Sequence, residues 1–356
     1  MNEEKVRILI VDDSRIVRKT IADTFRDDTG VDIVGEAANG EDALRLLSEV
    51  QPDVITLDVN MPGMDGLSAL KNLMITNPTP TVMISGLTQE GSNTAFESLR
   101  YGAVDFIPKP VVANKNDKEK LMTIISEKVK KAGRVKIEMA RYQRLVRKDK
   151  NVRSSAYVLP CTRVIGMGAS MGGYGSLLKV IPTLSADLQA AVLAVVYMPQ
   201  EFIKGFVAYL DDNSHILVTE AKNNTFITNG TCYIASAQNY MTLIDDEEGI
   251  KLHVNKAPFG VKWEGSINML LFTIAELLAE NSMAVILAGS GKDGVEGVKE
   301  MFRVGAEVVV QDIHTCMESE MPEAVIKETS VKNVIPDSSI AKSINKWAEQ
   351  HRNREK

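Results

Sequence analysis

The chain has 356 residues, which is enough for two domains with separate hydrophobic cores. Apolar residues make up 44% of the sequence and charged residues 25%, as in an ordinary soluble globular protein. The net charge of -6 is too small to indicate nucleic acid or a membrane surface as the main partner.

The cysteines and the first residues bear on where the protein works. Cys161, Cys232 and Cys316 are scattered without CxxC spacing, and an odd number fits no complete disulfide framework. The sequence starts without an apolar signal segment and has no apolar run long enough to span a bilayer. We therefore predict a protein of the reducing cytoplasm that is neither exported nor inserted into a membrane.

The first block of the chain alternates short apolar runs with amphipathic stretches. A helix is expected over 41–50, where the apolar residues keep to one face. Continuous apolar strands are typical of a parallel sheet covered on both sides, so we expect a doubly wound α/β domain over residues 5–130. The predicted strands are 6–11, 53–57, 81–84 and 104–107, and Ser14 is expected to cap the helix after the first strand.

A basic stretch separates this block from a second one. Residues 131–159 are rich in Arg and Lys and poor in acidic residues, which favours a solvated, partly helical linker. The alternative is electrostatic contact with an acidic partner or with the acidic edge of the first domain. From 160 to 348 the alternation resumes, with strands expected near 163–168, 190–196 and 283–288, and it predicts a second doubly wound, Rossmann-like α/β domain.

Polar side chains follow the predicted strands of the first domain. They are Asp12 and Asp13 after the strand 6–11, Asp58 after 53–57, Ser85 after 81–84 and Lys109 soon after 104–107. Because the carboxyl ends of parallel strands meet at one edge of the sheet, we expect these side chains to converge there. Crowded carboxylates repel one another unless a cation neutralises them, and oxygen ligands without Cys or His indicate Mg²⁺. The pattern predicts a carboxylate that accepts a phosphoryl group beside a metal ion.

Residues 5–130 resemble a two-component receiver domain. The matching segments are Val11-Asp-Asp13, Asp58-Val-Asn-Met-Pro-Gly-Met-Asp-Gly66, Ser85-Gly86 and Lys109-Pro110. The resemblance implies a histidine kinase as phosphodonor and Asp58 as phosphoacceptor. It implies Mg²⁺ held by Asp13, Asp58 and the Asn60 carbonyl, with Asp12 alongside. It also implies a switch formed by Ser85, Phe106 and Lys109.

A glycine-rich segment, Gly166-Met-Gly-Ala-Ser170-Met-Gly-Gly173, follows the first predicted strand of the second domain. Its glycines permit a sharp turn that exposes the Ser170 hydroxyl near a helix N-terminus, as for a nucleophile. A plain structural turn is the alternative. Dinucleotide binding fits less well, because the third glycine of the GxGxxG pattern is displaced to Gly172 and no ribose-binding acid stands at the expected spacing.

A second glycine-rich loop places Asp293 just after another predicted strand, so Ser170 and Asp293 are expected to share one crevice. A serine hydrolase of this kind needs a histidine between the two, because the imidazole takes the serine proton and the aspartate orients the imidazole.

Residues 160–348 resemble the catalytic domain of chemotaxis protein-glutamate methylesterases, and the order of receiver, linker and esterase also matches that family. The resemblance rests on GASxGG at Ser170, MPxxFxxxF from Met198, YIA at Tyr233 and DGxxG at Asp293. It implies removal of methyl esters from glutamates of chemoreceptors, and in many members deamidation of receptor glutamines. It implies Ser170 as nucleophile, Asp293 as orienting acid, and no cofactor in this domain. In the family, the unphosphorylated receiver covers the catalytic crevice and phosphorylation releases it.

The chain departs from the family pattern where the general base is expected, because Tyr197 stands at the position of the catalytic histidine. A tyrosine, with an ordinary pKa of about 10, is a poor base at neutral pH. The threonine after the serine is Met171, the methionine before Gly291 is Ser290, and the segment from Ser236 to Tyr240 lacks the usual proline, glycine and histidine. None of the chain's histidines matches a triad position: His215, His253, His314 and His351.

Two functions remain open on this basis. One is a response regulator, phosphorylated on Asp58, that controls a methylesterase acting on methyl-accepting chemoreceptors. The other is a catalytically impaired esterase-like domain that serves as a phosphorylation-controlled docking module, or a receiver that acts only as a phosphate sink.

Overall fold

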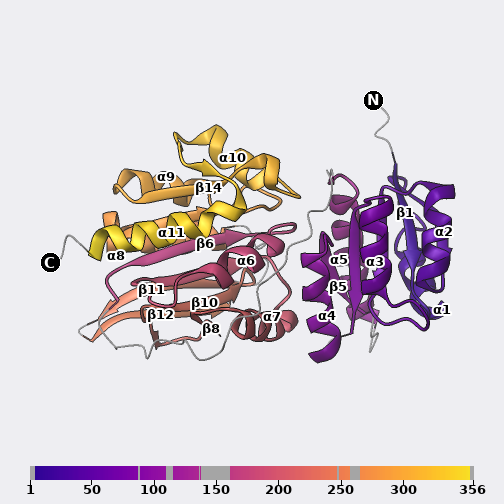
Figure 1. Cartoon of the computed structure of the whole chain (residues 1–356), viewed down its shortest axis with the longest axis horizontal. Helices are drawn as coiled ribbons and strands as arrows, with labels where there is room; N and C mark the ends of the chain where they lie inside the picture. The colour runs from indigo at the N-terminus through magenta and orange to yellow at the C-terminus, as the bar shows by residue number, and fades with distance from the viewer. Residues whose placement is uncertain are drawn as a thin grey trace. The chain divides into compact units, whose positions relative to one another are not determined.

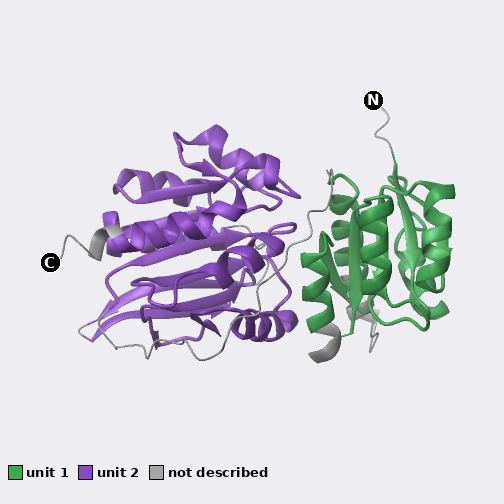
Figure 2. Ribbon diagram, viewed as in Figure 1, with its two compact units in different colours: residues 1–144 green, residues 145–356 purple. Residues whose placement is uncertain are grey.

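The computed structural model describes residues 5–86, 89–109, 115–135, 137, 161–246, 248–256 and 265–352. The chain divides into two compact units, residues 1–144 and 145–356 (Figure 1, Figure 2). Residues 138–160, which hold most of the expected basic linker, lie outside the described residues, as does Pro110. Among the helices that are described, none is long and apolar enough to cross a bilayer.

The first unit is a five-stranded parallel sheet with strand order β2-β1-β3-β4-β5. Its strands are β1 Val6–Val11, β2 Val31–Ala37, β3 Val54–Asp58, β4 Thr81–Ser85 and β5 Asp105–Pro108. Its helices are α1 Arg15–Thr24, α2 Gly40–Val50, α3 Gly66–Thr76, α4 Gln89–Arg100 and α5 Lys115–Ala132. Every residue of β3 and β4 is buried, as the continuous apolar runs predicted.

The topology of this unit brings its acidic residues to one edge. The chain reverses its winding direction at β1, which lies between β2 and β3, and ligand crevices of open α/β sheets form at such points. Val11 pairs with Leu57 across β1 and β3, so Asp12 and Asp58 follow neighbouring strand positions. Ser14 caps α1 as predicted, since its hydroxyl accepts a hydrogen bond from the Val17 amide at 3.5 Å.

The second unit contains a seven-stranded parallel sheet with order β15-β14-β13-β6-β7-β10-β8. Its strands are β6 Val164–Ala169, β7 Ala191–Val196, β8 Leu217–Glu220, β10 Thr231–Ser236, β13 Ser282–Ile286, β14 Glu307–Gln311 and β15 Val334–Ile335. The helices are α6 Tyr174–Val180, α7 Gln200–Asn213, α8 Ser266–Leu278, α9 Val295–Arg303, α10 Glu320–Glu328 and α11 Asp337–Arg352, with short 3-10 turns at 181–183, 279–281 and 313–315. The prediction of two doubly wound parallel α/β sheets is confirmed.

A small antiparallel sheet is an addition to this plan. Strands β11 (Asn239–Asp246), β12 (Gly249–Lys256) and β9 (Thr225–Phe226) form it, in the order β11-β12-β9. Met241 and Leu243 of β11 and Leu252 of β12 are buried in the same hydrophobic cluster as α8. The antiparallel sheet therefore covers part of the unit's core.

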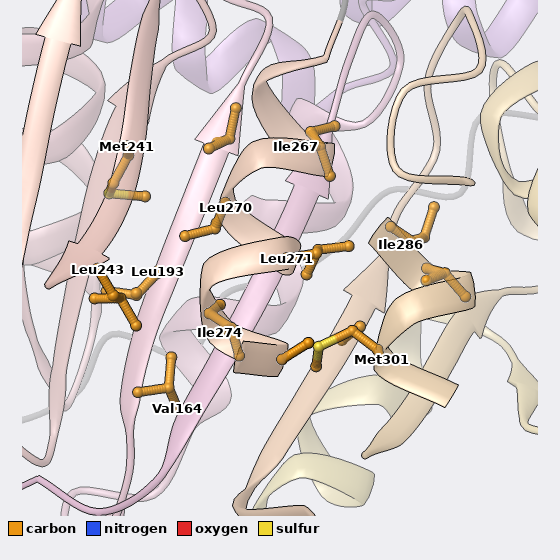
Figure 3. Packing of buried hydrophobic residues seen from close by; sticks show 14 of the residues in the cluster. Val164, Leu193, Met241, Leu243, Ile267, Leu270, Leu271, Ile274, Ile286 and Met301 are labelled. Carbon is orange, nitrogen blue, oxygen red and sulfur yellow. The ribbon is translucent and has the colours of Figure 1, made fainter. Parts of the chain in front are cut away.

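Helix α8 forms the centre of that core (Figure 3). Its buried residues recur at helical spacing and pack against β6, β7 and β13: Ile267, Leu270, Leu271 and Ile274. Gly168 of β6 makes this approach possible, because a Cβ there would lie 2.7 Å from the Ile267 side chain. The second glycine of the Gly-x-Gly segment thus serves helix–sheet packing, which supports a structural role for it over phosphate binding.

Candidate functional sites

Three carboxylates lie together at the carboxyl edge of the first sheet. Asp12, Asp13 and Asp58 each offer an oxygen, and these oxygens lie within 4.8 Å of one another. Asp12 and Asp58 are fully buried, whereas Asp13 is exposed. Burial and the neighbouring charge of Asp58 raise the pKa of Asp12 to about 6. The cluster therefore carries more negative charge than its buried surroundings favour.

Lys109 is the cation of this site. Its Nζ donates a hydrogen bond to Asp58 Oδ2 at 2.6 Å and lies 3.8 Å from Asp12 Oδ2. Burial alone would lower the pKa of Lys109, but its hydrogen bond to Asp58 and the acidic charges outweigh burial and raise it. Burial raises the pKa of Asp58, and Lys109 opposes that rise without cancelling it. One fixed positive charge thus compensates only part of the cluster.

The donor set fits a divalent cation. Asp12 Oδ2 is buried and has no hydrogen-bond partner among the described residues. A buried carboxylate oxygen left unpaired costs free energy, so this atom is suited to face a metal ion or a water bound to one. Carboxylate oxygens without thiolate or imidazole ligands suit Mg²⁺.

The other residues of the sequence prediction lie on or just after the neighbouring strands β3, β4 and β5. The Asn60 amide donates to Asp58 Oδ1 at 3.2 Å, which orients the carboxylate. Ser85 is buried, and its hydroxyl donates to the Gly86 carbonyl at 3.1 Å. Phe106 is buried and packs edge to face against Phe96, with ring centroids 5.5 Å apart. Phe106 is thus held inside the unit.

In the second unit, Ser170 follows β6 in a tight turn. The Gly173 amide donates to the Ser170 carbonyl at 2.8 Å, and the Ser170 amide donates to the Ala288 carbonyl at 3.3 Å. Gly173 is required by this packing, because a Cβ there would lie 2.1 Å from the Ala288 oxygen. Ser170 is nearly buried, and among the described residues its hydroxyl has the Ser290 hydroxyl, 3.4 Å away, as hydrogen-bond partner.

Tyr197 and Asp293 form a second pair at the same edge of the sheet. The Tyr197 hydroxyl donates to Asp293 Oδ2 at 2.6 Å. Asp293 also accepts hydrogen bonds from the amides of Ile267 at 2.8 Å and Asn268 at 3.0 Å, so it caps the start of α8. Tyr197 therefore takes the contact with the acid that an imidazole would need in a triad.

Sequence reasoning missed the residues that support these groups. Gln311 is fully buried, and its Oε1 accepts from the Ala288 amide at 2.9 Å, which fixes the loop behind Ser170. The Glu318 carbonyl accepts from the Gly289 amide at 2.9 Å. Neither residue belongs to a recognisable motif, because each binds a backbone amide that is distant in the sequence.

Two of the histidines lie on elements that do not carry Ser170. His253 lies on β12 beside Asn255, and His314 lies in the 3-10 turn after β14. Neither His253 nor His314 has a hydrogen bond to the Ser170 hydroxyl among the described contacts.

Comparisons with known proteins agree with this division into an α/β unit that carries the carboxylate cluster and an α/β unit that carries Ser170. A model described as response regulator receiver domain matches residues 8–125, and one described as CheB methylesterase matches residues 165–344. The class of protein is thus a response regulator with a methylesterase-type output domain.

Relatives span the whole chain. A protein-glutamate methylesterase/protein-glutamine glutaminase of Pyrococcus horikoshii is 35% identical over 351 residues, covering 97% of this chain and 94% of the relative. A protein of the same description from Geobacter metallireducens is 34% identical over 355 residues, covering 96% and 98%. The solved CheB methylesterase catalytic domain of Thermotoga maritima is 29% identical, covers 52% of this chain and 98% of its own, and has a TM-score of 0.49. The chain belongs to the CheB methylesterase family.

Proposed function

We propose that the chain is a chemotaxis-type response regulator that accepts a phosphoryl group on Asp58 from a histidine kinase and thereby controls its methylesterase-type domain. The observation that carries this proposal is the cluster of Asp12, Asp13 and Asp58 with Lys109 bonded to Asp58. A kinase donor and scattered free cysteines favour a cytoplasmic location.

Each receiver residue has a part in this proposal. Asp13, Asp58 and the Asn60 carbonyl would hold Mg²⁺ with Asp12 alongside, and the ion supplies charge neutralisation for the transferred phosphoryl group. Asp58 Oδ attacks phosphorus, the new O–P bond forms, and the bond to the donor breaks. Lys109 then pairs with the phosphoryl oxygens, and the Ser85 hydroxyl donates to one of them, while Phe106 changes its packing.

Phosphorylation by acetyl phosphate tests the receiver assignment. With Mg²⁺, the wild-type chain should gain one phosphoryl group by intact mass, and Asp58→Asn should gain none. Asp53→Asn is the matched control, because Asp53 is an aspartate of the same unit that lies before β3 and bonds to the Arg7 amide instead. Labelling of Asp58→Asn at the wild-type level would remove Asp58 from this role.

For the output domain, we propose Ser170 as the nucleophile toward methyl esters of chemoreceptor glutamates. Its Oγ bonds to the ester carbonyl carbon, methanol leaves with the serine proton, and water then hydrolyses the acyl-serine. The relatives' names also include glutaminase activity, so we extend the proposal to receptor glutamines, from which ammonia would leave. If no imidazole accepts the Ser170 proton, turnover should be slow compared with that of an enzyme with a complete Ser-His-Asp triad.

A second candidate function is favoured by the bond between Tyr197 and Asp293. If the tyrosine stays bonded to the acid and no base serves Ser170, the domain docks on receptors without hydrolysis, and phosphorylation regulates docking. The receiver could also act alone by drawing phosphoryl groups from the kinase. Methanol release from methylated receptors separates hydrolysis from both.

A further inference from the structure

Arg18 of α1 contacts the loop that carries the first two carboxylates of the receiver site. Its Nη1 donates to the Asp12 carbonyl at 2.8 Å and to the Asp13 carbonyl at 3.2 Å. Its Nε donates to Glu36 Oε2 at 3.2 Å, and its side chain is only 16% exposed. The guanidinium therefore links α1, the loop after β1 and strand β2.

Other hydrogen bonds among the described residues hold the loop on either side of Asp13, at Asp12 and at Ser14. The Asp12 amide donates to the Ala37 carbonyl at 3.2 Å, and the Ser14 amide donates to Asp12 Oδ1 at 2.8 Å. These bonds hold Asp12, whereas the exposed Asp13 depends on its backbone for position. Arg18 supplies a bond at the Asp13 carbonyl, so it fixes the residue from which a metal ligand projects.

We propose that Arg18 is a positioning residue for the divalent-cation site, acting through the backbone of Asp12 and Asp13. The inference rests on the proposed Mg²⁺ site of the receiver. Arg18 points its guanidinium at carbonyl oxygens, so it orders the loop without occupying the carboxylates. Glu36 of β2 accepts the hydrogen bond from Arg18 Nε and so holds the guanidinium in place, while its own side chain is half-exposed.

Charge and position predict opposite effects at this residue. Arg18 is a cation near an acidic cluster, so if charge alone mattered, its removal should strengthen Mg²⁺ binding. Loss of loop positioning should weaken Mg²⁺ binding instead. Outer partners of metal ligands typically change metal affinity by about 10–100-fold when they are removed. The sign of the change therefore identifies the mechanism.

The experiment is calorimetric titration of the full chain with Mg²⁺, because both tryptophans, Trp263 and Trp347, lie outside the receiver and give no fluorescence signal there. Arg18→Ala should bind Mg²⁺ about 10-fold more weakly. Arg15→Ala is the matched control: Arg15 is an exposed arginine on the same helix, its side chain makes no hydrogen bond to the loop among the described residues, and its variant should stay within about twofold of wild type. Arg18→Lys keeps the charge but lacks the planar fork, so it should bind at least about threefold more weakly.

A second readout separates positioning from general damage. In phosphorylation by acetyl phosphate, Arg18→Ala should need more Mg²⁺ for half-maximal rate yet approach the wild-type rate at saturating Mg²⁺. Wild-type or tighter Mg²⁺ affinity in Arg18→Ala, or equal weakening in Arg15→Ala, overturns the proposal. If Arg18→Ala does not fold, wild-type affinity in Arg18→Lys overturns it.

Asp13→Asn distinguishes this inference from the function on which it rests. If the wild-type chain binds Mg²⁺ and Asp13→Asn does not, the site stands and only the role of Arg18 is in question. If Asp13→Asn binds as well as wild type, the metal site itself is wrong.

Discussion

At the scale of single residues, Asp12 makes the stability of the metal-free receiver depend on pH. Burial and the charge of Asp58 raise its pKa from 3.8 to about 6. As the pH rises, the folded state therefore keeps a proton that the unfolded chain has already lost at lower pH. Between about pH 4 and pH 6 the folded state binds more protons, and this contribution to stability is lost as pH rises.

The variant Asp12→Asn should therefore be stabilised relative to wild type at pH 7 and much less so at pH 4.5. The expected difference between the two pH values is on the order of 2 kcal/mol in the absence of Mg²⁺. Differential scanning calorimetry in chelator measures it. An equal effect of the substitution at both pH values would contradict a raised pKa of Asp12.

Tyr197 is the residue that most limits the proposed esterase. In Tyr197→His, an imidazole could donate to Asp293 through one nitrogen and accept the Ser170 proton at the other. Because general-base catalysis contributes about 10²–10⁴-fold in rate, methanol release should rise at least about 10-fold. Tyr197→Phe is the control, since it also loses the hydroxyl but gains no base. Equal rates in both variants would locate the defect beyond position 197.

At the scale of elements, Asp293 after β13 caps α8 in addition to its proposed place in catalysis. Asp293 accepts the amides of Ile267 and Asn268 in addition to the Tyr197 hydroxyl. Asp293→Ala should therefore lower the free energy of unfolding by about 1–2 kcal/mol, because a helix cap is lost. Asp293→Asn, which keeps an acceptor oxygen, should lose less. Denaturant unfolding of the full chain measures both, and unchanged stability of Asp293→Ala would deny the capping role.

Several buried strands were predicted from the sequence, whereas the fully buried β10 and the strands of the antiparallel sheet were not. Strands β1, β4 and β7 are nearly continuous apolar runs, so their positions and a parallel sheet could be predicted from the sequence pattern. Strand β11 buries the alternate residues Met241 and Leu243, and β12 buries Leu252, so no continuous apolar run marked them. The antiparallel sheet is therefore a finding of the structure.

The candidate sites divide in the same way. Strand ends predicted Asp12, Asp58 and Lys109 at one edge, and in the structure Lys109 bonds to Asp58 and lies 3.8 Å from Asp12, although their roles stay predictions. The pairing of Tyr197 with Asp293, and of Ser170 with Ser290, depends on side-chain directions that no spacing in the sequence specifies. The contacts of Arg18 with two carbonyls are equally invisible in a sequence, because backbone acceptors carry no motif.

At the scale of the whole molecule, the two chemistries lie in different units. Asp58 belongs to residues 1–144, and Ser170 belongs to residues 145–356. Phosphorylation of Asp58 can control Ser170 only if it changes the free energy of a contact made by the second unit. The proposed function therefore predicts that Asp58→Asn abolishes the response to acetyl phosphate and leaves Ser170 chemistry at its basal rate.

Methanol release from membranes carrying methylated chemoreceptors tests this most directly. The full chain is assayed with and without acetyl phosphate and Mg²⁺, with Ser170→Ala and Asp58→Asn beside it. We predict slow release that rises on phosphorylation, disappears in Ser170→Ala and loses its phosphorylation response in Asp58→Asn. Release no greater than in Ser170→Ala, with Asp58 demonstrably phosphorylated, would contradict an esterase and leave a docking module or phosphate sink with an esterase fold.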